Sequence, residues 1–223
     1  MAPKYKVTRA RSKEKKDDQF ERIIQAGIKL FQKKGSEGFS LRNLADELGM
    51  TKNNLYNYVS SKRELWLAIR NKFYSQYYKE NRKIVEEHEG TTIDLLLELS
   101  KQYAEFAKRD YAVFRMMFAT SSAPLSDKVG KIEKAYKEFR LLDGTTRTIQ
   151  KAKNDGEINP KNPAMAALFL YSLLFGVNYV NMNRREGNPV LENIQLSIDD
   201  ISNEEFYEYV LNIVEKLLKS DML

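Results

Sequence analysis

The chain has 223 residues, a net charge of +6, no cysteine and a single histidine, His88. This composition excludes disulfide bonds, thiolate metal sites and cysteine nucleophiles, and one histidine in the polar run EEHEG does not provide a Ser/His/Asp triad or a histidine-rich metal site. Residues 1–74 hold seventeen Lys and Arg against eight Asp and Glu, a net +9, so the remainder is net −3. The amino-terminal third therefore predicts a polyanionic partner.

The first sixteen residues are a basic lead, with KYKVTRARSKEKK at positions 4–16. They lack the apolar segment of a secretion signal, so we expect a cytoplasmic protein. We predict a flexible arm over residues 1–16. Two roles stay open for it: an arm that follows the DNA minor groove or backbone, and a disordered solubilising tail.

Three short helices are predicted after this arm. Ser40 is a good N-cap for a second helix, Leu41–Leu48, which Gly49 ends. The third segment, Lys52–Tyr58, has only Leu55 and the adjacent Val59 as inward apolar residues, so most of its side chains must face outward. The first helix carries an apolar stripe that ends at a basic turn with glycine: Phe20, Ile23, Ile24, Gly27, Leu30 and Phe31.

A glycine turn between the second and third helices indicates a helix-turn-helix. Asparagine pairs well with adenine and lysine favours guanine in the major groove. We therefore predict that Lys52, Asn53, Asn54 and Asn57 read base edges. Phosphate contacts are predicted for Tyr56, Tyr58 and Lys62.

A long helix follows, opened by the S-x-x-E spacing of Ser61 and Glu64, which is typical of a capping box. It continues without Pro or Gly to about His88, a length of roughly 40 Å at 1.5 Å per residue. Such a helix is long enough to join two domains. We place the helix-turn-helix domain at residues 17–62 and a second domain at residues 63–223.

The second domain shows helical spacing throughout and no trustworthy strand pattern, so the predicted fold class is all-α. The run Ala164–Val177 is short for a membrane span and predicts a helix buried on more than one side, so no membrane partner is expected. Helices are expected near Thr92–Lys108, Asp110–Ala119, Asp127–Asn154, Pro163–Arg184 and Asn203–Ser220.

Residues Ile23–Ile69 resemble the DNA-binding domain of the TetR family of transcriptional regulators, over about a fifth of the chain. Two positions depart from the family pattern: Asn53, where Gly or Ala is frequent, and Val59, where Phe is usual. The matching residues are Ala26, Leu30, Phe31, Gly35, Phe39, Ser40, Leu44, Ala45, Gly49, Thr51, Lys52, Leu55, Tyr56, Tyr58, Lys62, Glu64 and Leu65.

The resemblance implies a dimeric repressor that binds a palindromic double-stranded DNA operator and is released by a small effector. It implies that Ser40 caps the second helix and touches phosphate, that Arg42 contacts the backbone or a base, and that Thr51 opens the recognition helix. The last two helices would pair in a four-helix bundle between subunits. The predicted dimer residues are Phe169, Leu173, Val177, Phe206, Val210, Ile213 and Leu217.

The resemblance also implies an effector pocket in the second domain. Bulky apolar residues favour an elongated apolar effector, and we hypothesise a fatty acid or long-chain acyl-coenzyme A that regulates lipid metabolism, with Arg109, Arg115 or Arg140 as partners of its anionic group. The alternative is a multidrug sensor of an efflux system, which would use an acid such as Glu98, Glu105 or Glu138. The predicted pocket residues are Tyr103, Phe106, Phe114, Met117, Phe118, Tyr136, Phe139, Phe169, Phe175 and Tyr179.

Two other classes of function fit the sequence less well. An enzyme would need a nucleophile, a metal site or a cofactor motif, and neither a GxGxxG nor a Walker motif is present, so we expect no catalytic residue, no metal and no cofactor besides the effector. A purely architectural DNA-binding protein would explain the basic lead and the helix-turn-helix. It would not explain the long aromatic-rich remainder.

Overall fold

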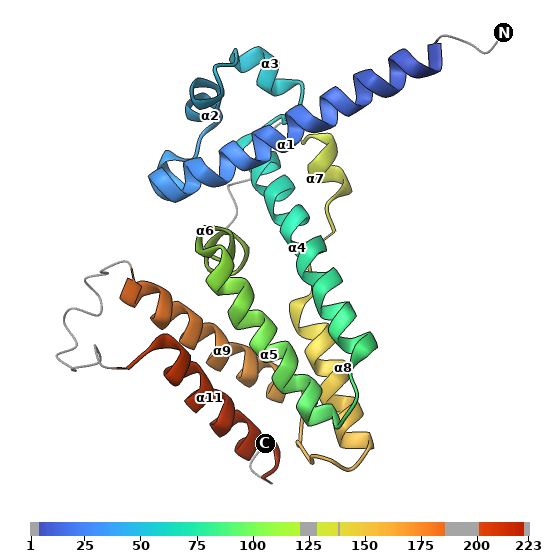
Figure 1. The fold of residues 1–223 in the computed structure, drawn as a ribbon, viewed down its shortest axis with the longest axis vertical. Coiled ribbons are helices and arrows are strands. Elements are labelled where there is room, and N and C mark those ends of the chain that lie inside the picture. Colours follow the sequence, from blue (N-terminus) through green and yellow to red (C-terminus); the bar gives the residue numbers. More distant parts are fainter. Residues whose placement is uncertain (1–4, 121–128, 138, 186–200, 221–223) are drawn as a thin grey trace. The chain divides into compact units, whose positions relative to one another are not determined.

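The computed structural model describes residues 5–120, 129–137, 139–185 and 201–220, and the regular structure in these ranges is helical (Figure 1), which confirms the all-α prediction. The helices of the first part are α1 (Tyr5–Gly38), α2 (Leu41–Leu48), α3 (Lys52–Tyr56) and α4 (Lys62–Glu87). They are followed by α5 (Thr92–Arg109), α6 (Tyr111–Phe114), the π-helical turn η1 (Arg115–Ala119), α7 (Lys131–Ala135), α8 (Leu141–Asn154), α9 (Pro163–Arg185) and α11 (Asn203–Leu218).

The chain divides into two compact units. The first comprises Met1–Gln76 and Ala112–Lys137, and the second comprises Tyr77–Tyr111 and Glu138–Leu223. The sequence predicts a boundary after residue 62 instead. The boundary falls later because the first half of α4 belongs to the core of the first unit, where Leu65, Trp66 and Ile69 are at most 1% exposed.

The core of the first unit is built around three aromatic rings. Phe31 of α1, Phe39 before α2 and Trp66 of α4 meet edge to face, with ring centroids 5.5–6.0 Å apart. Each ring is at most 2% exposed. Aromatic pairs in this geometry gain about 0.5–1.5 kcal/mol beyond the burial of their area. This cluster therefore joins α1 and α4 beneath the α2–α3 pair, in which α2 contacts both α1 and α3.

One local prediction differs from the structure, and another is confirmed. Residues 5–16 continue α1 as helix, whereas a flexible arm was predicted there. Gly35 has φ 63° and ψ −166°, which breaks the regular helix at the predicted glycine.

A single helix over Asp127–Asn154 was also predicted, and this is wrong. Residues 121–128 lie outside the described part of the chain, and residues 136, 137, 139 and 140, which lie between α7 and α8, are not helical. Phe139 lies in this break and packs edge to face on Tyr78, with centroids 4.9 Å apart. This tertiary contact favours the break over a continuous helix. The predicted helix would also contain Gly130 and Gly144, and glycine has a low helix propensity.

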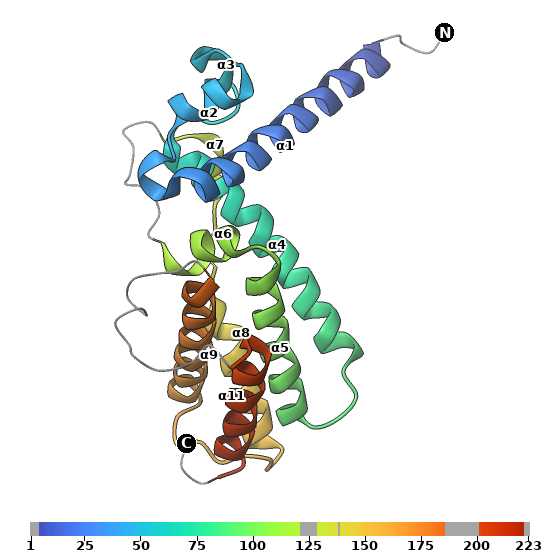
Figure 2. The ribbon, with the colours of Figure 1, turned by 60° about the vertical axis from the view of Figure 1, so that its left-hand side comes forward.

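The second unit is a helical bundle in which α8 packs on α5 and α9, and α11 packs on α5 and α9 (Figure 2). Its core includes Leu96, Ile149, Ala167, Leu170 and Val214, each at most 4% exposed. The apolar stripes that the sequence predicted for these helices thus meet one another.

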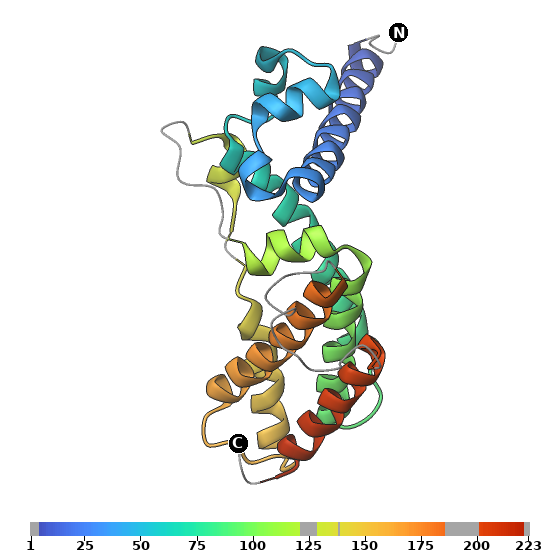
Figure 3. The same ribbon diagram turned by 90° about the vertical axis from the view of Figure 1, so that its left-hand side faces the viewer.

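Helix α9 is buried on one side only within the chain, which corrects the prediction of burial on more than one side. Met165 is 68% exposed, Leu168 52% and Phe169 43%, and α11 lies beside α9 (Figure 3). Among the described residues, Pro163–Met182 is the one helix long and apolar enough to cross a membrane by length and composition, which is weak evidence because core helices pass the same test.

His88 closes the turn between α4 and α5. Its Nε2 lies 2.8 Å from the carbonyl oxygen of Thr91, and its Nδ1 lies 3.1 Å from Oε2 of Glu98. Both acceptors are satisfied at once only by the doubly protonated ring, because a neutral imidazole has one N–H. The Thr91 carbonyl, and then the Glu98 carboxylate, raise the pKa of His88 above 6.5.

We expect this turn to make the stability of the second unit depend on pH. A raised folded-state pKa gives stabilisation that is fully present below pH 6.5 and is lost as the pH rises through the folded-state pKa. Urea denaturation followed by circular dichroism should show a lower midpoint at about pH 8 than at about pH 5.5. In His88→Gln this difference should shrink, and an equal difference in the variant would contradict the assignment.

Candidate functional site

Helix α2 is held at both ends by its own caps. The Ser40 hydroxyl accepts a hydrogen bond from the Asn43 backbone N–H at 3.2 Å, and the Asn43 side-chain amide donates to the Gly38 carbonyl at 2.8 Å. Gly49 has φ 62°, a left-handed conformation that favours glycine, and it ends the helix. These caps set the turn from which α3 starts.

Helix α3 is capped by Thr51, whose hydroxyl accepts from the Asn54 backbone N–H at 3.2 Å. Leu55 and Val59 are both 0% exposed, so they anchor this segment to the core. The side chains that remain exposed around them are Lys52, Asn53, Asn54, Tyr56 and Asn57. The structure therefore brings the predicted base-reading residues together on one solvent-facing surface, as a helix inserted in a major groove requires.

The predicted phosphate-binding residues surround this surface. The ammonium groups of Lys52 and Lys16 lie 5.7 and 5.9 Å from the ring centroids of Tyr56 and Tyr58, respectively. Lys62 donates to the Ser36 carbonyl oxygen at 2.9 Å and so is tied to the end of α1. A lysine has three donors, which leaves Lys62 able to contact a phosphate as well. Arg42 is exposed at the start of α2.

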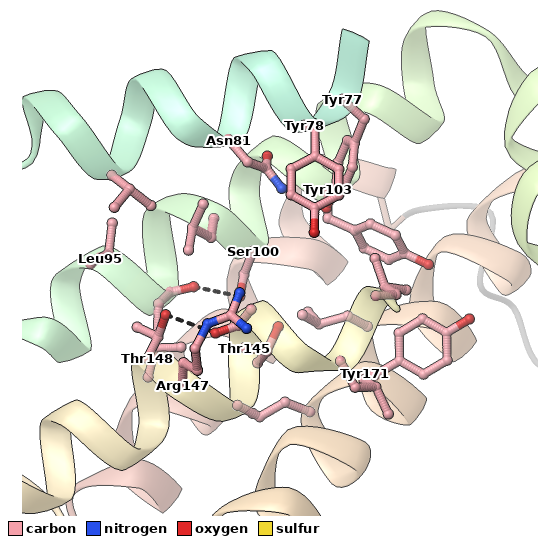
Figure 4. Close-up of a pocket in the computed structure, with 18 of the residues that line it drawn as sticks. Tyr77, Tyr78, Asn81, Leu95, Ser100, Tyr103, Thr145, Arg147, Thr148 and Tyr171 are labelled. Atoms are coloured by element: carbon pink, nitrogen blue, oxygen red, sulfur yellow. Dashed lines mark hydrogen bonds between the residues drawn. The ribbon is translucent and has the colours of Figure 1, made fainter. Parts of the chain in front are cut away.

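The second unit contains a cavity of about 480 Å³ among the carboxyl-terminal half of α4, α5, α8 and α9 (Figure 4). Small-molecule sites typically enclose about 300–1,000 Å³. The lining side chains are mostly aromatic or aliphatic: Tyr77, Tyr78, Val85, Leu95, Leu96, Leu99, Tyr103, Phe139, Leu141, Leu142, Leu170, Tyr171 and Leu174.

The polar lining is cationic and contains no Asp or Glu among the described residues. Lys151 is ion-paired with Asp155 at 2.7 Å, and Arg82 with Glu86 at 2.7 Å. Arg147 has no hydrogen bond or ion pair within the described chain, so its charge is available to a ligand.

Two hydroxyl groups of the lining are already used, since Ser100 donates to the Leu96 carbonyl at 2.7 Å and Thr148 donates to the Gly144 carbonyl at 3.1 Å (Figure 4). Asn81 contributes a buried Oδ1 with no hydrogen-bond partner in the structure. A buried polar atom without a partner is costly, so Asn81 is a second position at which a ligand would gain a polar contact.

Two phenols of the cavity, those of Tyr77 and Tyr103, stay neutral at physiological pH. Burial raises the pKa of Tyr77 to about 12. Burial also raises the pKa of Tyr103 well above its usual range. Both phenols and Arg147 line the same cavity (Figure 4), and neutral phenols do not compete with a ligand anion for Arg147.

The structure places only two of the ten predicted pocket residues in this lining, Tyr103 and Phe139. Phe106 is in the core of the second unit, 5.2 Å from the Tyr77 ring, and Phe175 stacks between Tyr171 and Tyr179. The others belong to the first unit or to the exposed face of α9: Phe114, Met117, Phe118, Tyr136, Phe169 and Tyr179.

Sequence reasoning missed Tyr77, Tyr78, Asn81 and Arg147. The signal for two of these was present, because Tyr77 and Asn81 are four residues apart and share one face of a helix. It was overlooked because the helix was interpreted as a linker.

The charged residues proposed for the effector lie elsewhere. Arg109 pairs with Glu80 at 2.6 Å, and Arg140 pairs with Asp143 at 3.2 Å. Arg115 belongs to the first unit, with its guanidinium 5.6 Å from the centroid of Phe31.

Of the acids considered for a cationic drug, Glu98 faces His88 and Glu105 lines a second, polar cavity of about 290 Å³. Glu138 lies outside the described residues. No group of His, Asp and Glu suited to a metal ion occurs in the described part of the chain.

The residues predicted for the dimer interface divide into two sets. Val177 and Val210 are 3% and 6% exposed and belong to the core of the second unit. The others are exposed or half-buried on α9 and α11: Phe169, Leu173, Phe206, Ile213 and Leu217.

Comparison with known proteins gives the same picture of the first unit. Residues 23–69 match the family described as bacterial regulatory proteins, tetR family. No curated protein sequence matches the chain.

Solved structures resemble the chain over most of its length. A TetR/AcrR-family transcriptional regulator from Thermobifida fusca has 19% identity and a TM-score of 0.58, covering 92% of this chain and 99% of that one. The fatty acid degradation regulator FadR from Bacillus halodurans has 12% identity and a TM-score of 0.59, covering 92% and 96%. AibR in complex with isovaleryl coenzyme A and operator DNA has 16% identity and a TM-score of 0.61, covering 87% and 97%.

The two kinds of residue on α3 should respond differently to substitution. Leu55→Ala should lower the free energy of unfolding of the first unit by about 2–5 kcal/mol, because it leaves a cavity at a fully buried position. Asn53→Ala should change it by less than about 0.5 kcal/mol, as expected at an exposed site. Urea denaturation followed by the fluorescence of Trp66, the only tryptophan, reports on this unit. Equal destabilisation by both variants would show that the outer face of α3 is packed.

Proposed function

We propose that this chain, whose residues 23–69 belong to the tetR family of bacterial regulatory proteins, is a ligand-responsive transcriptional repressor in the cytoplasm. The observation that carries the proposal is that apolar residues within and just after α3 are buried while the polar residues around them are exposed. Leu55 and Val59 are fully buried, while the amides and lysine around them are exposed. The exposed side chains have no packing role in the protein. Their amide and ammonium groups suit the hydrogen-bonding base edges of a major groove.

The repressor acts as a homodimer on a palindromic operator. The outward face of α9 and α11 supports this, because Met165, Leu168, Phe169 and Tyr209 are between 43% and 68% exposed in the single chain. Several large apolar side chains exposed on neighbouring helices suit a protein interface. Twofold symmetry presents two recognition helices and calls for half-sites about one helical turn, roughly 34 Å, apart or a little more.

The effector is a fatty acid or a long-chain acyl-coenzyme A, and its release of the operator would regulate lipid metabolism. An aliphatic and aromatic cavity suits an acyl chain, and Arg147 suits the carboxylate or phosphates of its polar end. Two of the similar structures are named for related ligands or pathways, fatty acid degradation in one and isovaleryl coenzyme A in the other. No membrane partner is part of this proposal.

A multidrug sensor of an efflux system is the second candidate. A cationic drug would need an acid in the cavity, and the described lining supplies arginine and lysine instead. An architectural DNA-binding protein is the third candidate. It would have no use for a cavity of about 480 Å³ in its second unit.

Selection of sheared genomic DNA from the source organism on the purified protein tests the regulator proposal. We expect a short palindrome to be enriched. Arg42→Ala should reduce the slope of log affinity against log salt by about 1, because one phosphate contact is lost. Retention of DNA without sequence preference at any salt concentration would favour the architectural candidate. Genes beside the palindrome separate the other two: lipid-degradation genes support the acyl effector, and an efflux pump supports the drug sensor.

Arg147→Gln should weaken the binding of palmitoyl-coenzyme A by about tenfold or more, the loss expected when a charged hydrogen bond of about 1.5–3 kcal/mol is removed. Thermal-shift titration measures this, because a ligand that binds the folded state raises the melting temperature. Arg140→Gln is the matched control, since Arg140 does not line the cavity. Absence of a shift in the wild-type protein with any acyl chain length would end the acyl hypothesis.

A further inference from the structure

The segment Gly130–Lys137, which we call the strap, belongs to the first unit although it lies far from the helix-turn-helix in sequence. It contains α7, and it contacts the amino-terminal end of α4 (Figure 1). These residues were predicted to be part of a long helix of the second domain. The structure gives them a different role, which depends on two consecutive residues of α4, Arg63 and Glu64.

Glu64 holds the strap with its carboxylate. The side chain is buried, with 1% of the residue exposed. Oε2 accepts the Ser60 backbone N–H at 2.6 Å, and Oε1 accepts the Ile132 backbone N–H at 2.7 Å. One carboxylate therefore caps the chain entering α4 and the start of α7 together. Hydrogen bonds to a charged acceptor are roughly twice as strong as neutral ones, and a buried carboxylate that lost them would be left unsatisfied.

Two further contacts define the position of the strap. Arg63 Nε lies 2.6 Å from Glu133 Oε1. Gly130 sits so close to Glu64 that an added Cβ would be 2.0 Å from its Oε1. The backbone of Gly130 has φ −84°, which any residue adopts, so a larger residue here is opposed by the Glu64 carboxylate and not by backbone conformation. A side chain at this position would displace the carboxylate from its hydrogen bonds.

The strap is also connected to the cavity through the chain itself. Shortly after Lys137, the last residue of the first unit, Phe139, Leu141 and Leu142 line the cavity of the second unit. Phe139 packs on the Tyr78 ring at 4.9 Å. A ligand in the cavity would contact these residues, which lie a few peptide bonds from the anchored strap.

We propose that the strap is a positioning element of the DNA-binding unit and that it transmits occupancy of the cavity to that unit. Glu64 is the positioning residue, since it fixes the start of α4 two residues after the predicted phosphate-binding Lys62. The displacement of Phe139 and its neighbours by a ligand pulls on the strap and disturbs the Glu64 anchor. The second half of this proposal rests on the proposed function, whereas the first half concerns the unliganded protein alone.

Gly130→Ala tests the strap, because its Cβ removes the space beside Glu64 while leaving the ligand cavity and α3 unchanged. We expect operator affinity without ligand to fall by about tenfold, and the further loss of affinity caused by palmitoyl-coenzyme A to shrink to less than about threefold. Lys134→Ala is the matched control, since Lys134 is exposed on α7 and its side chain makes no hydrogen bond or ion pair with the described residues of α4. It should retain the ligand effect of the wild type. A Gly130→Ala protein that binds and releases operator like the wild type would overturn the proposal.

A second measurement does not depend on operator or ligand. The chain has no cysteine, so Ala135→Cys gives a unique and exposed site for a nitroxide spin label. The label should be restricted in the otherwise unchanged protein and mobile when Gly130→Ala is added. If the wild type enriches no operator, the proposed function has failed, and this measurement alone decides the anchoring. A label that is equally mobile in both proteins would overturn the strap.

Discussion

Burial of Trp66 against Phe31 and Phe39 is the interaction on which the DNA-binding unit depends. Helices α2 and α3 are short, eight and five residues, and helices of this length are marginal in water. They persist because Leu44 and Leu55 are fully buried against a base that the aromatic cluster holds together. A rigid base of this kind allows α3 to expose polar side chains whose own packing contributes little.

Several side chains in this unit serve structure while keeping the capacity to bind DNA. The Ser40 and Thr51 hydroxyls accept backbone N–H groups as helix caps, and each still has an O–H to donate. Lys62 uses one of three donors on the Ser36 carbonyl. A cap fixed in this way presents its remaining donor in a defined direction, and a phosphate contact then orders no additional side chain.

The second unit combines a packed core with a cavity, and the packed core must offset the stability that the cavity costs. Unfilled apolar volume lowers stability because lining atoms lose dispersion contacts. Ile149, Ala152 and Ala167 are fully or nearly fully buried where α8 packs on α9, and other residues of these two helices line the cavity together with α4 and α5. The cluster of tyrosines around it tolerates both an empty and an occupied state, because aromatic rings bury a large area with two rotatable bonds.

The sequence by itself determined the helix-turn-helix, because caps, turn and apolar positions lie within a few residues of one another. Ser40, Gly49, Thr51 and Leu55 each act locally, and spacing reveals them. The tertiary structure alone decided the cavity and the strap. Tyr77 and Arg147 line one cavity only because helices distant in sequence surround it. The space available at Gly130 is limited by a carboxylate 66 positions earlier in the sequence. No pattern along the chain encodes such contacts, because packing between distant segments creates them.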